Sequence, residues 1–179
     1  MRYLPFVVAL GCCACQRGGT DEPVAGELCA MARMATSEAA AMRASALASY
    51  EASAEDFDLD RRWRAGELGS SDASGKLASA QRRGWQDAYI GDTWCRASER
   101  VDAFAVSAVR RVQPDSPAER AFVEASQLAC ASLDVFDRLI THDPAKARAF
   151  LNDARAGFAR RTERAQALLA ACRAAASEP

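Results

Sequence analysis

Histidine is almost absent from this sequence. The chain has 179 residues and a single histidine, His142. Any mechanism that needs an imidazole base must use this residue, and a Ser–His–Asp set cannot be assembled. Zinc and iron sites would lack most of their usual nitrogen ligands. The sequence therefore favours a protein that is not an enzyme, and we expect no cofactor.

A strong charge of either sign is also missing. The formal net charge is −1, and pairs of arginines are scattered among acids along the chain. Neither feature matches the basic footprint of a nucleic-acid-binding protein. We therefore expect no nucleic-acid partner, and the net charge gives no sign of attraction to an acidic membrane surface.

Long apolar runs, glycines and prolines are scarce too. Beyond the first residues, no apolar run approaches the roughly 20 residues that cross a bilayer. The chain has 10 glycines and 6 prolines, whereas half of it is hydrophobic and alanine is abundant. This composition favours helix strongly, and the length fits one domain with a core of useful size.

The amino terminus has the order of an export signal. Arg2 supplies a positive charge, the stretch 4–10 is apolar, and Gly11 precedes Cys12. This pattern resembles the bacterial lipobox, and the resemblance implies that Cys12 receives a diacylglyceride and is N-acylated after cleavage. Ala9 stands where the lipobox prefers leucine, and the signal of 1–11 is short, so Cys15 and then Cys13 are alternative lipidation sites.

The resemblance divides the chain into three parts. Residues 1–11 are the signal peptide, and residues 12–22 carry Gly18 and Gly19 without an apolar anchor, which predicts a flexible tether. Residues 23–176 form one helical domain. Several acyl chains, palmitate among them, would make the membrane anchor stable and place the protein in the cell envelope, on the outer membrane or the periplasmic face.

Apolar positions then recur at spacings of three and four, which indicates amphipathic helices. The expected stripes run through Ala39 and Met42 in the first helix, through Trp94 and Phe104 in the longest, and past a charged interruption at Arg161 in the last. The pattern predicts an all-α, antiparallel up-down bundle of four main helices and one short extra helix, over residues 23–53, 54–67, 74–112, 117–141 and 144–176.

Local signals support two of the helix starts. Ser116 can cap a helix that begins at Pro117, and Glu119 would close a capping box. Asp143 can cap the last helix, which begins at Pro144. The turns before these helices are short, which makes consecutive helices antiparallel neighbours.

Four cysteines remain after the signal region, and an even number in an exported chain indicates disulfides. If the helices alternate in direction, Cys29 and Cys172 lie at the same end of the bundle. Cys95 and Cys130 lie about one helical turn apart in height around the turn at Pro114. We therefore predict the pairs Cys29–Cys172 and Cys95–Cys130, which would stabilise a core lined by small alanines.

One acidic run could bind a metal. Asp56, Asp58, Asp60 and Glu67 match acidic positions of an EF-hand-like calcium loop, but Arg61 stands where the loop needs glycine. The favoured interpretation is the acidic start of the short helix, where carboxylates suit the positive end of the helix dipole.

Large side chains also gather in one stretch of the long helix, where an exposed patch for a partner is the alternative to the favoured interpretation, core packing. They are Trp85, Tyr89, Ile90 and Trp94. Together these observations favour a membrane-anchored helical lipoprotein that binds an unknown protein partner or supports the envelope. A lipoprotein that binds a small ligand or calcium is the alternative, and an enzyme has the least support.

Overall fold

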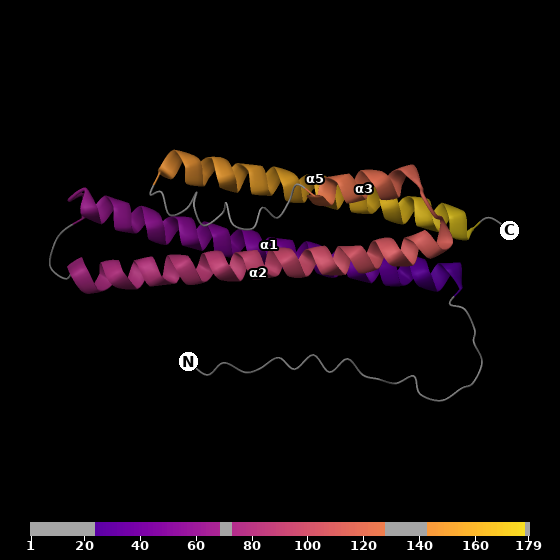
Figure 1. The fold of residues 1–179 in the computed structure, drawn as a ribbon, viewed down its shortest axis with the longest axis horizontal. Helices are drawn as coiled ribbons and strands as arrows, with labels where there is room; N and C mark the ends of the chain where they lie inside the picture. Colours follow the sequence, from indigo (N-terminus) through magenta and orange to yellow (C-terminus); the bar gives the residue numbers. More distant parts are fainter. Residues whose placement is uncertain (1–23, 69–72, 128–142, 178–179) are drawn as a thin grey trace, which may run out of the picture.

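A computed structural model describes residues 24–68, 73–127 and 143–177 of the chain. These residues form helices α1 (Ala25–Arg64), α2 (Ala73–Val112), α3 (Pro117–Gln127) and α5 (Pro144–Ala176), and no strand occurs among them. Successive helices run in opposite directions along one long axis (Figure 1). The predicted all-α, antiparallel bundle is therefore confirmed. The rest of the predicted helix 117–141 lies outside the described residues.

The predicted short extra helix over residues 54–67 is not separate, because most of it belongs to α1. Residues 25–64 form one continuous helix of 40 residues, so the expected break near residue 54 is wrong. The acidic run that suggested a new helix start lies in the last turns of α1, where arginines neutralise it: Asp56 pairs with Arg83 of α2 and Asp58 pairs with Arg61. Because these charges are paired, they do not interrupt the helix.

The end of α1 is set by a glycine. Gly66 has a positive φ of 74°, its N–H donates to the carbonyl of Trp63, and the N–H of Glu67 donates to the carbonyl of Arg62. These two hydrogen bonds form a Schellman motif, which satisfies carbonyls that the helix end leaves open. The chain then returns as α2 beside α1.

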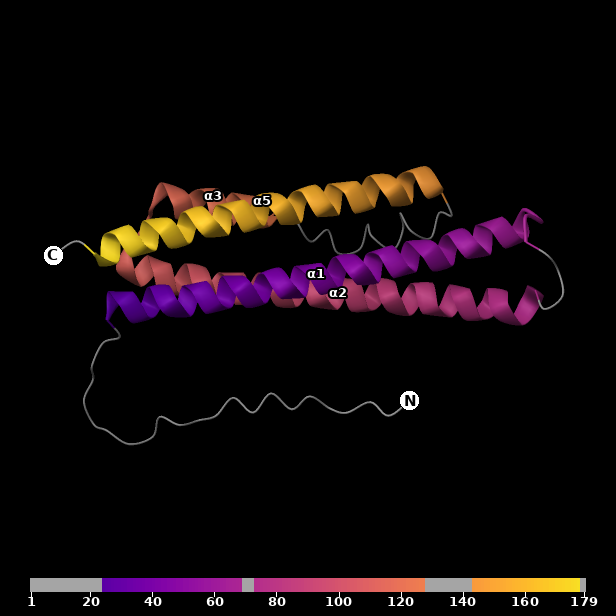
Figure 2. The ribbon, with the colours of Figure 1, turned by 180° about the vertical axis from the view of Figure 1, so that it is seen from behind.

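Helices α1 and α2 pack as a long antiparallel pair (Figure 2). The buried positions of α1 alternate at spacings of three and four, which is the heptad repeat of a left-handed coiled coil. Most of these side chains are small, and alanine seams let helix backbones approach closely. The buried residues that follow this repeat are Ala32, Thr36, Ala39, Arg43, Ala46, Tyr50, Ser53, Phe57 and Asp60.

Two glycines of α2 make room for the aromatic side chains of α1. A Cβ at Gly91 would lie 2.6 Å from ring carbons of Tyr50, and a Cβ at Gly84 would lie 3.2 Å from the ring of Phe57. Tyr50 and Phe57 are seven residues apart, as are Gly84 and Gly91, so the same contact repeats one heptad further along. These glycines allow large rings within a seam of small residues.

Replacing Gly91 by alanine is expected to destabilise the fold, although alanine is the better helix former. Alanine gains about 1 kcal/mol in helix propensity, but overpacking against Tyr50 costs about 1–3 kcal/mol. Gly75→Ala is the matched control, because a Cβ at Gly75 meets nothing within 4 Å. In thermal unfolding, Gly75→Ala should raise Tm and Gly91→Ala should lower it; equal Tm values would contradict the close contact.

The predicted caps are present, with one difference. The Ser116 hydroxyl accepts from the N–H of Glu119 at 3.1 Å, and the Asp143 carboxylate accepts from the N–H groups of Ala145 and Lys146 at 3.0 and 3.3 Å. The Glu119 carboxylate instead accepts from Arg110 of α2. An ion pair between α2 and α3 therefore replaces the second half of the predicted capping box.

Two of the predicted apolar stripes contain misplaced residues, although Ala39 of the first stripe is fully buried, at 0% exposure. Met42 is half-buried, and the core position beside it belongs to Arg43, which is 2% exposed. In α2, Trp94 and Phe104 are exposed by 40% and 50%. The fully buried α2 residues in that stretch are Cys95 and Ser98, at 0% exposure, and Asp102, at 1%. Large apolar residues were poor guides to these core positions because polar and charged residues, among them Arg43, Ser98 and Asp102, occupy several of them.

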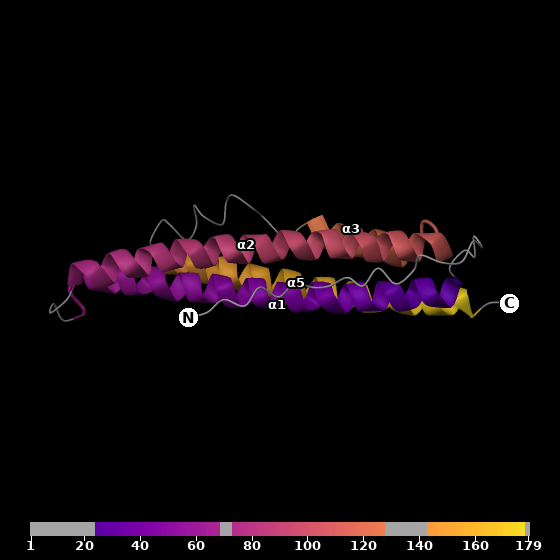
Figure 3. The ribbon, with the colours of Figure 1, turned by 90° about the horizontal axis from the view of Figure 1, so that it is seen from below.

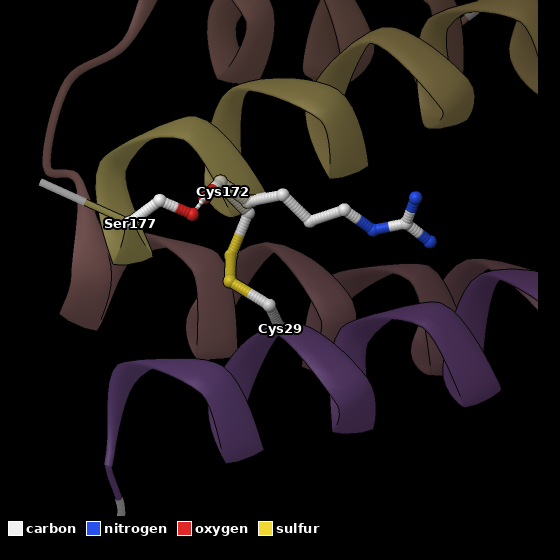
Figure 4. Close-up of a disulfide and its surroundings, with 4 residues drawn as sticks. Cys29, Cys172 and Ser177 are labelled. Carbon is white, nitrogen blue, oxygen red and sulfur yellow. Dashed lines mark hydrogen bonds between the residues drawn. A yellow bond between two sulfur atoms is a disulfide. The ribbon is translucent and has the colours of Figure 1, made fainter.

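The Cys29–Cys172 disulfide closes one end of the bundle. It joins the first turns of α1 to the last turns of α5, beside Ser177, with a Cα–Cα distance of 5.8 Å (Figure 4). This pair is the one that alternating helix directions predicted. None of the described helices carries an apolar segment long enough to cross a membrane.

Candidate functional site

Three charged side chains meet in the core, one from each of the long helices. Asp102 Oδ2 of α2 accepts from Arg43 Nη1 of α1 at 2.7 Å and lies 2.6 Å from Arg161 Nε of α5. All three side chains are at most 2% exposed. We call Arg43, Asp102 and Arg161 the charged layer.

The charged layer divides the apolar core into two clusters. On one side lie Leu28, Ala105 and Leu168, in the cluster that contains the disulfide. On the other side lie Tyr50 and Phe158, in a second cluster that also contains Cys95. In each of the three long helices, the charged residue lies between the two apolar segments, so the three charges lie at one level of the bundle.

The charges in this layer do not balance within it. Two guanidinium groups share one carboxylate: Arg43 donates to Asp102 Oδ2 and Arg161 forms an ion pair with the same oxygen, while Asp102 Oδ1 has no hydrogen-bond partner. Arg43 Nε and Nη2 and Arg161 Nη1 are likewise buried without a partner. Buried polar groups are usually hydrogen-bonded, so this layer costs stability that other contacts must offset.

Burial dominates the titration of these groups. Desolvation raises the pKa of the Asp102 carboxyl, although Arg161 and Arg43 oppose this shift. Desolvation also lowers the pKa of the Arg43 guanidinium, and Asp102 opposes it. Burial raises the pKa of nearby Glu99, with Arg161 acting against it. Each shift expresses the cost of bringing charge into a low-dielectric core.

Open spaces flank the charged layer on two sides. A cavity of about 480 Å³ between α2, α3 and α5 is lined by residues that include Glu99, Asp102 and Arg161. A groove of about 490 Å³ between α1 and α5 is lined by residues that include Arg43 and Phe158. The charged layer therefore lies beside a cavity and a groove, although its own side chains are buried.

The arrangement is suited to fixing the register of the helices. Alanine contacts look alike after a slip of one heptad, so an alanine seam specifies register weakly. A slip of α1 along α2 would separate Arg43 from Asp102 and place each charge against an apolar cluster, which is strongly unfavourable. A buried polar layer is a known way to set register in coiled coils.

Sequence reasoning missed most of this layer. The sequence pattern marked Arg161 as a charged interruption in the last stripe, whereas Arg43 and Asp102 were not predicted to lie in the core. The signal that could have found them is the strict heptad phase, because Arg43 and Asp102 each continue the buried repeat of their helix. A charge at such a position has to be paired.

The candidate calcium residues do not form a loop. Asp56, Asp58 and Asp60 lie on a helix that turns about 100° per residue, so Asp58 points away from the other two. Asp60 pairs with Arg64 at 3.1 Å, and Glu67 lies near Arg61 and Arg62. Among the described residues, no group of three His, Cys, Asp or Glu could hold a metal ion.

The aromatic stretch of α2 is exposed, which contradicts core packing. Trp85, Tyr89, Ile90 and Trp94 are exposed by 40%, 66%, 43% and 40%. Trp85 still packs against Phe57 in a T-shaped arrangement, with ring centroids 6.1 Å apart. The other three also leave apolar surface in solvent, so the core-packing interpretation is wrong for these side chains, and a patch for a partner stays a prediction.

The remaining cysteines and the single histidine of the predicted sites lie mostly outside the described residues. Cys95 is disulfide-bonded, and its predicted partner Cys130 lies outside the described residues. His142 and the three candidate lipidation cysteines, Cys12, Cys13 and Cys15, also lie outside them. Comparisons of the chain with models of protein families, with curated proteins and with solved structures gave no match.

Proposed function

We propose that the chain is an exported lipoprotein, held on a membrane by acyl chains on Cys12, whose helical domain acts as a non-enzymatic binding or structural part of the cell envelope. The observation that carries the proposal is the Cys29–Cys172 disulfide. Disulfides persist in oxidising compartments and are rare in the cytosol. A disulfide bond that joins the two ends of the domain therefore agrees with export, as the lipobox resemblance does.

The charged layer supports a non-enzymatic role. Its only carboxylate, Asp102, is bound to two arginines and is 1% exposed. A general base must reach the proton it abstracts, and this carboxylate, although it lines the cavity between α2, α3 and α5, is held by two arginines. The layer therefore acts on the fold, while partners meet the exposed faces of the helices.

Lipidation is tested by the intact mass of the protein purified from the membranes of a bacterial host that processes lipoproteins. We expect a mature chain that begins at Cys12 and carries acyl chains on its first residue. Cys12→Ser should abolish this processing and leave a chain that begins at Met1. Cys13→Ser is the matched control, because it changes the adjacent thiol and should leave the acylated mass otherwise unchanged.

Alkylation before and after reduction completes the measurement. Cys29 and Cys172 should resist alkylation until a reductant is added, because their sulfurs are bonded to each other. An unprocessed wild-type chain with free thiols at both positions would contradict export. Acylation at Cys15 or Cys13 would keep the anchor and move the lipidation site.

A further inference from the structure

One line of α2 residues lies on the more exposed side of the helix, with Ala97 half-buried and the others exposed. Ile90, Ala97, Arg100, Phe104 and Arg111 recur at spacings that keep them on one side of the helix. With Trp94 at its edge, we call this line the outer stripe. Ile90 and Phe104 are exposed by 43% and 50%. Figure 3 views the bundle from the side on which α1 and α2 lie in front of α5.

The charges of this part of α2 are segregated. From residue 90 to residue 112, the helix has three carboxylates, Asp92, Glu99 and Asp102. Asp92 and Asp102 are buried, and Glu99 lines the cavity toward α3 and α5. Arg100 and Arg111 are exposed on the outer stripe. The outer stripe therefore combines apolar and aromatic side chains with positive charge only, which the net charge of the whole chain conceals.

The apolar and positively charged side chains of the outer stripe favour an anionic lipid surface over a second copy of the chain as its partner. A second copy of the chain, packed stripe to stripe, would bring the same arginines together without a carboxylate to offset them. An anionic lipid surface complements them, because arginines beside it gain electrostatic attraction. Tryptophan and phenylalanine suit the boundary between headgroups and acyl chains, and arginine stems can extend so that their guanidinium groups reach the headgroups.

We propose that the outer stripe of α2 lies on the surface of a membrane that contains anionic lipids, with Ile90, Trp94 and Phe104 at the acyl boundary. This inference rests on the proposed lipid anchor, which would hold the bundle close to the surface. Helix α1 begins at the end of the bundle where α2 finishes (Figure 1). A tether over residues 12–23 can span at most about 40 Å when extended, so α2 stays within reach.

Two tryptophans of α2 give a matched pair of probes. Trp85 and Trp94 are both 40% exposed, and nine residues of helix place them about 180° apart around α2. Trp63→Phe with Trp85→Phe leaves only Trp94, and Trp63→Phe with Trp94→Phe leaves only Trp85. The acylated full-length protein is reconstituted into vesicles of phosphatidylglycerol and brominated phosphatidylcholine. Circular dichroism first verifies that both variants keep their helix content.

We expect the bromine atoms to quench roughly half of the Trp94 emission and little of the Trp85 emission, since an interfacial helix buries one face to a depth of about 5–10 Å. Reversing the charges with Arg100→Glu and Arg111→Glu should reduce quenching of Trp94 at least about twofold. Arg160→Glu with Arg164→Glu, on the exposed side of α5, is the control and should leave the quenching unchanged.

The possible failures are distinct. Acylated protein in which Trp94 is quenched no more than Trp85 would overturn this inference and leave the anchor in place. Quenching that survives the reversal of Arg100 and Arg111 would overturn the role given to the arginines. Protein that carries no acyl chain by mass would overturn the proposed function and this inference together.

Discussion

Replacing Cys29 and Cys172 together by alanine is expected to lower the free energy of unfolding by about 5 kcal/mol. The disulfide closes a loop with a sequence separation of 143 residues, and in the chain-entropy account a loop of this length restricts the unfolded chain by about that much. Typical small domains are stable by only about 5–15 kcal/mol. Urea denaturation without reductant, followed by circular dichroism, measures the change.

A reductant provides the control for this disulfide. Reduction should destabilise the wild-type protein more than the double variant, because the variant has already lost the Cys29–Cys172 bond and keeps the disulfide of Cys95. A double variant within about 1 kcal/mol of the oxidised wild-type protein would show that the bundle does not depend on this bond.

Replacing Asp102 by asparagine is expected to cost about 3–5 kcal/mol. The variant keeps the shape of the side chain and removes the only negative charge in the charged layer, which leaves Arg43 and Arg161 buried and unpaired. Breaking a buried ion pair from one side costs this much because an uncompensated charge stays in the core. Denaturant unfolding at neutral pH measures the loss.

A triple variant separates the charge from the packing. Replacing Arg43 and Arg161 by methionine and Asp102 by leucine removes all three charges and keeps comparable volume. Such replacements are often neutral or stabilising by about 1–4 kcal/mol, so the triple variant should recover the stability that Asp102→Asn loses. If Asp102→Asn instead unfolds within about 1 kcal/mol of wild type, the charged layer is not the main buried contact between these helices.

The triple variant also tests the register. If the charged layer selects one alignment of α1 on α2, its removal should leave a stable helical protein with less uniform packing. Near-ultraviolet circular dichroism and the spread of amide chemical shifts measure this uniformity. A triple variant with a wild-type spectrum would show that the glycine and aromatic contacts set the register by themselves.

The sequence was sufficient for features that depend on local chemistry. Proline, serine and aspartate mark the starts of α3 and α5 because their caps act within a few residues, and these boundaries are confirmed. The direction of the helices follows from short turns, and from that direction the pairing of Cys29 with Cys172 follows as well.

The sequence was misleading where charge and hydrophobicity were taken as signs of exposure and burial. The acids at 56–60 suggested a helix start, although arginines of α1 and α2 pair with them. Trp94 and Phe104 suggested the core side of α2, although they are exposed. In both cases the deciding partners lie on another turn or another helix, where a single segment carries no information about them.

The sequence by itself determined the all-α class, the capped starts of α3 and α5 and one disulfide of this protein, because propensity, periodicity and turn chemistry act over short distances. Only the tertiary structure decided that Arg43, Asp102 and Arg161 share the core and that the outer stripe of α2 faces solvent. Burial of a charge depends on its partner, and these partners lie 59 residues apart in the case of Arg43 and Asp102. A charged or an apolar side chain is buried or exposed according to which residues of the other helices pack against it.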